Sequence, residues 1–126
     1  MKYLIDTHLL LWAAADTLPK KALPYFLNEE NQLYFSTASI WEVVIKSKLN
    51  RPDFRVNPNA LYKGLLDNGY IELFINSQHA LSVLDIHTRH KDPFDHILLA
   101  QAKIEKCPLL SSDRTLSRYP SVIYIV

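Results

Sequence analysis

The hydrophobic and polar positions along this chain follow two periods, one typical of β-strands and one typical of α-helices. Short apolar runs predict strands at residues 2–5, 33–35, 71–75, 109–110 and 122–126. Apolar residues spaced three and four apart predict helices at residues 9–15, 20–29, 40–49, 58–67, 78–84 and 94–106. Strands that alternate with helices in this way predict an α/β fold, with a central, mostly parallel sheet flanked by helices in three layers.

Several polar residues have the spacing of helix caps. Asp92 followed by Pro93 is typical of a helix start, because aspartate caps well and proline suits the first helical position. Ser39 and Glu42 match a capping box, and Asp113 could cap the short segment that follows it. These three acids therefore have an ordinary structural explanation, against which any chemical role has to be weighed.

Length and composition restrict the class of protein. A chain of 126 residues with 48% hydrophobic residues predicts a single domain over residues 1–126 with a sizeable core. No apolar run approaches the roughly 20 residues of a membrane span, so we expect no membrane partner. The one cysteine, Cys107, fits a reducing compartment and predicts a cytoplasmic protein with a buried, inert thiol. With only two glycines, the chain lacks the glycine-rich loops that bind nucleotide phosphates.

The net charge of +1 does not by itself indicate a nucleic-acid binder. Local basic segments are the relevant feature, since a nucleic-acid contact needs a patch and not a global excess. Such residues are Lys46, Lys48, Arg51 and Arg55 in one segment, and Arg89 with Lys91 in another. Each group is equally well explained as the solvated end of a helix.

Four carboxylates fall where an α/β sheet places its ligands. Asp6 directly follows the first predicted strand, and Asp113 follows the strand at residues 109–110. Asp95 lies in the first turn of one predicted helix, and Glu42 lies early in another. Because ligands of such sheets bind beyond the carboxyl ends of the strands, these side chains are expected to converge there.

Clustered carboxylates repel one another, so they are most stable around a hard divalent cation. Mg²⁺ or Mn²⁺ fits this set of oxygen ligands and leaves coordination positions for water and phosphate. A zinc site formed by His87, His90 and Asp92 is a weaker alternative, because it lacks a cysteine or a third histidine.

Four stretches together resemble the PIN-domain ribonucleases of the VapC toxin type. They are L-I-D-T-H-L-L-L-W near the start, S-T-A-S-I-W-E-V in the middle, D-P-F-D-H-I-L-L-A-Q-A, and L-L-S-S-D near the end. The resemblance covers the whole chain and implies a PIN-like fold and a magnesium- or manganese-dependent endoribonuclease. It carries the acidic cluster, catalytic and metal-binding, onto Asp6, Glu42, Asp95 and Asp113, and small hydroxyl positions around the site onto Thr7 and Ser39.

The resemblance also implies partners: an RNA substrate, a cognate antitoxin protein and a second copy of the chain in a homodimer. A groove for the antitoxin could involve residues 9–12 of the first helix together with Ile40, Trp41 and Val44, and the alternative for most of these residues is a place in the core. The chain departs from the family pattern at His96, where D-P-F-D is usually followed by arginine. That change leaves the four acids intact and affects only the groups around them.

Three other functions remain open at this point. An aspartyl-nucleophile phosphatase also begins with an acid after its first strand, but such enzymes have a second aspartate where this chain has His8. A non-catalytic α/β interaction domain is the second alternative. The third is a PIN nuclease of RNA processing without a toxin role.

Overall fold

In the computed structural model the strands form one parallel sheet. The structure describes residues 1–87, 92–116 and 123–126. The strand order is β3-β2-β1-β4-β5, and every neighbouring pair is parallel. The chain therefore builds the sheet outward from β1 in one direction and then returns to the other side of β1. The strands are β1 (Lys2–Ile5), β2 (Gln32–Ser36), β3 (Ile71–Leu73), β4 (Leu109–Ser111) and β5 (Ile123–Ile125).

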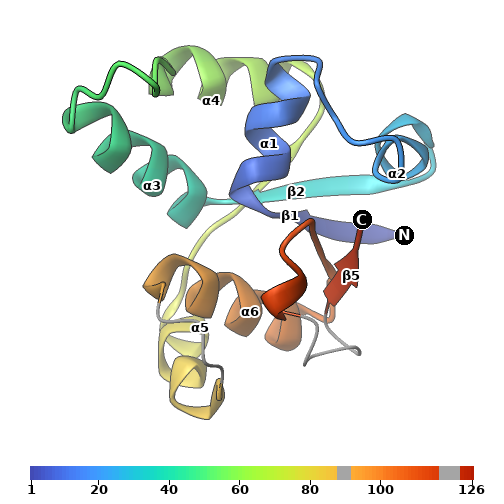
Figure 1. The fold of residues 1–126 in the computed structure, drawn as a ribbon. Helices are drawn as coiled ribbons and strands as arrows, with labels where there is room; N and C mark the ends of the chain where they lie inside the picture. The colour runs from blue at the N-terminus through green and yellow to red at the C-terminus, as the bar shows by residue number, and fades with distance from the viewer. Residues whose placement is uncertain (88–91, 117–122) are drawn as a thin grey trace.

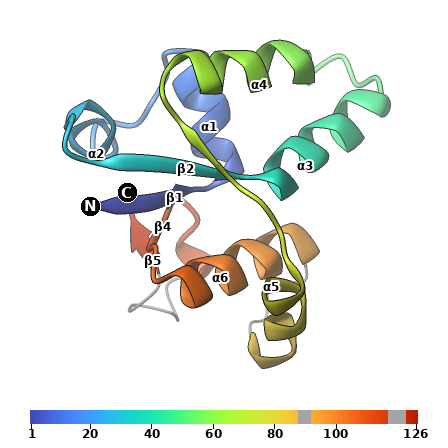
Figure 2. The same ribbon diagram turned by 180° about the vertical axis from the view of Figure 1, so that it is seen from behind.

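Helices cover both faces of this sheet. In two opposite views α1 and α4 lie on one side of it, and α5 and α6 lie on the other (Figures 1 and 2). The helices are α1 (Thr7–Ala14), α2 (Leu23–Leu27), α3 (Thr37–Lys48), α4 (Pro58–Asp67), α5 (Ser77–Ser82) and α6 (Pro93–Glu105), with short 3₁₀ turns at Val83–Asp85 and Arg114–Leu116. Within the described ranges no helix is long and apolar enough to cross a membrane. The predicted three-layer α/β architecture is confirmed.

The core lies in two parts, one on each face of the sheet. Alternation along β1 explains this division, because Tyr3 and Ile5 face one way and Leu4 the other. The first part joins β1 to residues of α1, α3 and α4, and the second joins it to α6. Cys107 belongs to the second part, where burial raises the pKa of its thiol to about 11. The expectation of a buried thiol is therefore confirmed.

Most predicted elements are found, but some bounds differ. The helix at 58–67 has the predicted limits, since Asn57 caps it and Asn68 ends it. The helix predicted at 20–29 is only α2, which starts immediately before Pro24 because proline cannot continue a preceding helical turn. The strand predicted at 71–75 ends at Leu73, and Phe74 is exposed. Part of the strand predicted at 122–126 lies outside the described residues.

Candidate active site

Asp6 lies at the point where the strand order reverses. β1 pairs with β2 on one side and with β4 on the other. The chain first extends the sheet from β1 through β2 to β3 and then crosses back to β4. Such a reversal opens a crevice at the carboxyl ends of the strands. Asp6 follows the last residue of β1 and is only 4% exposed. This arrangement puts a buried acid at the place where α/β proteins most often bind ligands.

The buried carboxylate of Asp6 accepts hydrogen bonds from two donors of the protein. One carboxylate oxygen, Oδ1, accepts a hydrogen bond of 2.8 Å from the backbone N–H of His8, so Asp6 is the N-cap of α1. The other, Oδ2, accepts a hydrogen bond of 2.8 Å from the hydroxyl of Ser111 at the end of β4. A buried acid in this position therefore does not by itself require a metal ion, although a carboxylate can accept about four such bonds.

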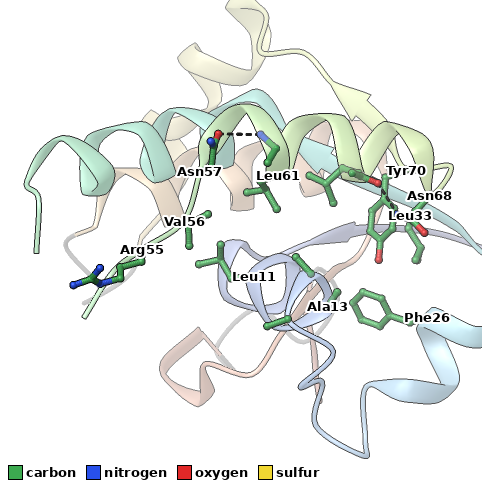
Figure 3. A pocket seen from close by; sticks show the side chains of 15 residues that line it. Leu11, Ala13, Phe26, Leu33, Arg55, Val56, Asn57, Leu61, Asn68 and Tyr70 are labelled. Atoms are coloured by element: carbon green, nitrogen blue, oxygen red, sulfur yellow. Dashed lines mark hydrogen bonds between the residues drawn. The ribbon is translucent and has the colours of Figure 1, made fainter. Parts of the chain in front are cut away.

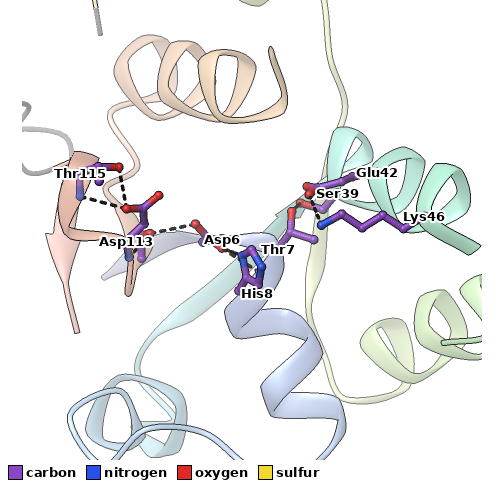
Figure 4. A network of polar contacts seen from close by, with 9 residues as sticks. Asp6, Thr7, His8, Ser39, Glu42, Lys46, Asp113 and Thr115 are labelled. Carbon is purple, nitrogen blue, oxygen red and sulfur yellow. Dashed lines mark hydrogen bonds and ion pairs between the residues drawn. The ribbon is translucent and has the colours of Figure 1, made fainter. Parts of the chain in front are cut away.

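A chain of hydrogen bonds continues from Asp6 to Asp113 (Figure 4). Ser111 donates to Asp6 and accepts a bond of 3.0 Å from the backbone N–H of Asp113. Oδ1 of Asp113 accepts from both the backbone N–H and the hydroxyl of Thr115, at 2.9 and 2.6 Å. Asp113 thus stands before the 3₁₀ turn at residues 114–116, which confirms its predicted role as a cap. Ser111 thus links the carboxylate of Asp6, which follows β1, to the backbone of Asp113, which follows β4.

The two small hydroxyl residues of the site meet directly. Thr7 begins α1, and its hydroxyl donates a buried hydrogen bond of 2.8 Å to the hydroxyl of Ser39 in α3. The predicted capping box of Ser39 and Glu42 is wrong, because α3 begins at Thr37 and its N-cap is Ser36. Both Ser39 and Glu42 are consequently inside the helix, where their side chains do not cap it.

Glu42 is buried, with 6% of its surface exposed, and it pairs with a lysine one turn later on the same helix. The ammonium nitrogen of Lys46 lies 2.9 Å from Oε2 of Glu42. A buried carboxylate is costly without such a partner. Lys46 therefore contributes to the structure of the site, although its charge could also be read as part of a basic nucleic-acid surface.

Asp92 and Asp95 have different positions at the start of α6. Asp92 is the N-cap, and its carboxylate accepts a hydrogen bond of 3.0 Å from the backbone N–H of Phe94, as predicted. Asp95 is the third residue of the helix and is half-buried. The start of α6 packs against α3 through the rings of Phe94 and Trp41, whose centroids are 5.3 Å apart. This contact brings the helix that carries Asp95 beside the helix that carries Glu42.

His8 lies at the mouth of the site, on α1. Its ring nitrogen Nδ1 is 3.7 Å from Oδ1 of Asp6, an ion-pair contact rather than an ordinary hydrogen bond. The pKa of His8 is raised, chiefly by this contact with the carboxylate of Asp6 and by its negative charge, while partial burial of the ring lowers it. Lys46 lowers this pKa and Glu42 raises it, so both charges act on the same ring.

The structure does not bring the four acids into a finished metal cage. Within the described residues, no three His, Cys, Asp or Glu side chains are grouped closely enough to hold a metal ion. Mg²⁺ needs less than this, because it typically binds one or two carboxylates and completes its shell with water and substrate phosphate. The buried oxygen donors around Asp6 therefore fit Mg²⁺ or Mn²⁺ by their chemistry, whereas a zinc site would require a closed set of nitrogen or sulfur ligands.

Lys46 and His8 are the residues near the site that the sequence did not single out for it. The spacing of Lys46 from Glu42 is the i,i+4 spacing of helical ion pairs, which is the signal that could have identified it. The suggested zinc alternative involves His90, and the second basic segment consists of Arg89 and Lys91. These three residues lie outside the described ranges.

A pocket of about 670 Å³ lies away from these acids, between α1 and α4 (Figure 3). Its walls are mostly apolar and include Leu11, Phe26 and Leu61, with Arg55 at one end. Burial raises the pKa of Tyr70, which also lines it, to about 12. Of the residues suggested for an antitoxin groove, Leu9 and Leu10 are fully buried, as expected if they are core residues. Leu11 alone of residues 9–12 lines the pocket.

Comparisons with known proteins give one family and a set of related folds. Among solved structures, the chain is similar to VapBC2 from Rickettsia felis bound to a promoter DNA fragment, with 14% identity, 98% of this chain and 96% of the other covered, and a TM-score of 0.71. It is similar to a toxin–antitoxin complex from Klebsiella pneumoniae (16% identity, 98% and 99% covered, TM-score 0.68). It is also similar to VapBC-1 from nontypeable Haemophilus influenzae (18% identity, 99% and 98% covered, TM-score 0.69).

Among curated proteins no significant match was found. At identities this low the structural likenesses establish the fold alone. The family model described as PIN domain matches residues 3–122, which is nearly the whole chain and includes all four acids. The chain therefore belongs to the PIN-domain family.

Proposed function

We propose that this protein is a cytoplasmic, metal-dependent endoribonuclease that hydrolyses RNA phosphodiester bonds and is the toxin of a toxin–antitoxin pair. The observation that carries the proposal is the buried Asp6 at the reversal of strand order, linked through Ser111 to Asp113, in a chain of the PIN-domain family. The toxin role is supported by the similar structures, which are described as VapBC and toxin–antitoxin complexes.

In this proposal Asp6 and Asp95 are the principal metal ligands, and Glu42 and Asp113 complete the set. When bound, Mg²⁺ or Mn²⁺ would supply a Lewis acid that stabilises the charge developing on the phosphate and acidifies a water molecule. The residues of the chain hold these acids in place. Ser111 orients Asp6, while Thr115 orients Asp113 and Lys46 orients Glu42.

Glu42 or Asp113 would take the proton from the attacking water. A carboxylate can do this if it is held beside the substrate with an oxygen available as acceptor. Thr7 and Ser39 lie between Asp6 and Glu42 in Figure 4, and their hydroxyls would contact the phosphate or its waters. Their mutual hydrogen bond fixes the start of α1 against α3 and so keeps the two acids in register.

The pocket between α1 and α4 is the proposed docking site for the antitoxin. Its apolar walls, formed by residues such as Leu11, Phe26 and Leu61, suit the apolar side of an amphipathic segment. A second copy of the chain would use a different surface. This surface, called the α3 stripe below, consists of Trp41, Val44, Ile45 and Leu49, which are 60%, 36%, 37% and 56% exposed. Exposed apolar residues at this spacing on one helix indicate a protein contact.

Cleavage assays with and without metal test the proposed activity. Wild-type protein should cleave single-stranded RNA with Mg²⁺ or Mn²⁺ and should stop when the metal is chelated. Asp6→Asn should lower the rate by about a hundredfold or more, on the order of 2.7 kcal/mol in barrier. Because asparagine caps helices as well as aspartate does, this variant should remain folded.

Asp67→Asn, an exposed aspartate at the end of α4, is the matched control and should cleave like the wild type. Cleavage that survives thorough chelation, or wild-type activity in Asp6→Asn, would show that the proposed site is wrong. An interaction domain without activity would bind partners but show no cleavage in any of these conditions.

A further inference from the structure

The Glu42–Lys46 pair differs from an ordinary surface ion pair. The side chain of Glu42 is 8% exposed and that of Lys46 is 38% exposed, and the two charged atoms are 2.9 Å apart. Another pair with the same i,i+4 spacing, Lys63 and Asp67 on α4, is 82% and 65% exposed, with its atoms 3.7 Å apart. The first contact is a charge-assisted hydrogen bond to a buried acid, whereas the second is a solvated pair of small energetic value.

Lys46 also lies within electrostatic reach of the residues around Asp6. Lys46 belongs to α3, the helix whose Ser39 meets the residue that directly follows Asp6. The hydrogen bond between Thr7 and Ser39 joins α1 to α3 in the same region. Figure 4 shows these residues side by side, with the Lys46 ammonium directed toward Glu42. The positive charge of Lys46 is thus part of the field in which a cation at the proposed site would bind.

We propose that Lys46 is a positioning residue that serves as the internal cation of the site: it holds the buried carboxylate of Glu42 in place without metal, and it competes with a divalent cation for that carboxylate. This inference rests on the proposed function, since it concerns the same acids. It has two consequences of opposite sign. Removing the charge of Lys46 leaves a buried carboxylate without its cation, which should destabilise the metal-free protein. The same change makes the site more negative, so a divalent cation should bind more tightly.

Thermal melts of the metal-free protein, followed by titration with Mg²⁺ and Mn²⁺, test both consequences. The main variant is Lys46→Gln, because glutamine can still donate a hydrogen bond to Glu42 but carries no charge. Its metal-free melting temperature should fall below that of the wild type, and its affinity for Mg²⁺ should rise by about tenfold, the order expected when a unit charge is removed several ångströms from a divalent ion. Lys46→Arg should restore wild-type behaviour in both measurements.

Lys63→Gln is the matched control, since it removes the charge of a lysine with the same spacing from its acid and should change neither quantity. If Lys46→Gln does not fold, the double variant Glu42→Gln/Lys46→Gln replaces it. Because this variant has neither charge, it should melt near the wild-type temperature, whereas Glu42→Gln alone should bind Mg²⁺ more weakly than the double variant.

The outcomes separate this inference from the proposed function. A wild-type protein that is stabilised by metal, with Lys46→Gln stabilised to the same degree, would overturn the role of Lys46 and leave the nuclease proposal standing. Equal Mg²⁺ affinity of the double variant and Glu42→Gln would overturn it in the same way. A wild-type protein that binds neither metal would overturn both proposals.

Discussion

At the scale of single residues, Asp6 has a structural role as a helix cap and a proposed chemical role as a metal ligand. Its carboxylate caps α1 through the N–H of His8 and accepts the hydroxyl of Ser111, so the metal-free protein already has donors for it. A substitution that removes the cap would therefore confuse instability with lost chemistry. Asparagine reduces this difficulty for Asp6, because it retains the capping oxygen and loses only the charge and the acceptor of the Ser111 hydroxyl.

Asp95 offers a clearer separation of the two kinds of role. If Asp95 acts only at the start of α6, Asp95→Asn should lose about 0.5–1 kcal/mol of favourable interaction between its charge and the helix dipole, and cleavage should persist. We expect the other result. As a ligand near other acids, Asp95 is repelled in the metal-free protein, so Asp95→Asn should melt at the wild-type temperature or above.

The same variant should gain less stability from added Mg²⁺ and lose cleavage by about a hundredfold or more. Melts with and without Mg²⁺, run beside cleavage of a bulk RNA, measure both effects. Asp85→Asn, an exposed aspartate outside the site, provides the reference for a simple loss of charge. An Asp95→Asn protein that is less stable and still cleaves would assign Asp95 to the helix start alone.

The sequence was sufficient to locate the acids but not their partners. Asp6, Asp95 and Asp113 could be placed at the sheet edge, because each stands at the end of a strand or the start of a helix whose pattern is visible. Ser111 could not be chosen over Ser112 as the bridge between Asp6 and Asp113, because the exact end of β4 and its register decide which hydroxyl meets Asp6. The convergence of the four acids was predicted only in outline, since the distances between them depend on how α3 and α6 pack.

At the scale of elements, the junctions from β1 to α1 and from β2 to α3 have the same construction. β1 passes into α1 through Asp6, and β2 passes into α3 through Ser36, without an intervening loop. In each case the residue at the end of the strand caps the next helix with its own side chain. Such short junctions fix the starts of α1 and α3 rigidly against the sheet, which is what positions Thr7 and Ser39.

These short junctions also explain why the predicted capping box in α3 was wrong. Ser39 and Glu42 have the spacing of a capping box, but the true cap lies three residues earlier, in the strand itself. The apolar pattern ended the predicted strand at residue 35, and nothing in it marked Ser36, the next residue, as the cap of a helix. The start of α6 was predictable, by contrast, because Asp92 stands before a proline that cannot belong to a preceding helix.

The cap of α6 gives a prediction at this scale. Asp92→Ala removes the acceptor of the Phe94 N–H and should destabilise the protein by about 1 kcal/mol, as measured by chemical denaturation. Cleavage should fall by less than about tenfold, because Asp95 itself remains. Asn57→Ala removes the cap of α4, away from the site, and should lower stability similarly without changing cleavage. Should Asp92→Ala abolish cleavage at unchanged stability, Asp92 and not Asp95 would be the acid of the site.

At the scale of the whole molecule, the acids and the two proposed contact surfaces occupy separate parts of the fold. Asp6 and Asp113 lie beyond the carboxyl ends of β1 and β4 (Figure 4), and the pocket lies between α1 and α4 (Figure 3). The α3 stripe is on the exposed side of the helix that carries the buried Glu42. Because each surface has its own residues, binding to the antitoxin and to a second copy should be separable by single substitutions.

Gly64 makes this separation testable. It lines the pocket from within α4, and a side chain added there would meet no atom of the protein within 4 Å at its Cβ. Gly64→Phe should therefore fill the pocket without disturbing the core, and replacing a glycine inside a helix should itself favour folding by a few tenths of a kcal/mol or more. We expect this variant to remain a dimer by light scattering, to retain cleavage, and to lose inhibition by the antitoxin.

Ile45→Glu is the complementary change, because it places a charge in the α3 stripe at a side chain that is already 37% exposed. This variant should become monomeric and still bind the antitoxin. Gly64→Ala, which adds only a methyl group to the pocket, is the control for both and should behave like the wild type. Full inhibition of a folded Gly64→Phe protein would place the antitoxin elsewhere, and a monomeric Gly64→Phe would mean that the pocket, and not the α3 stripe, holds the second copy.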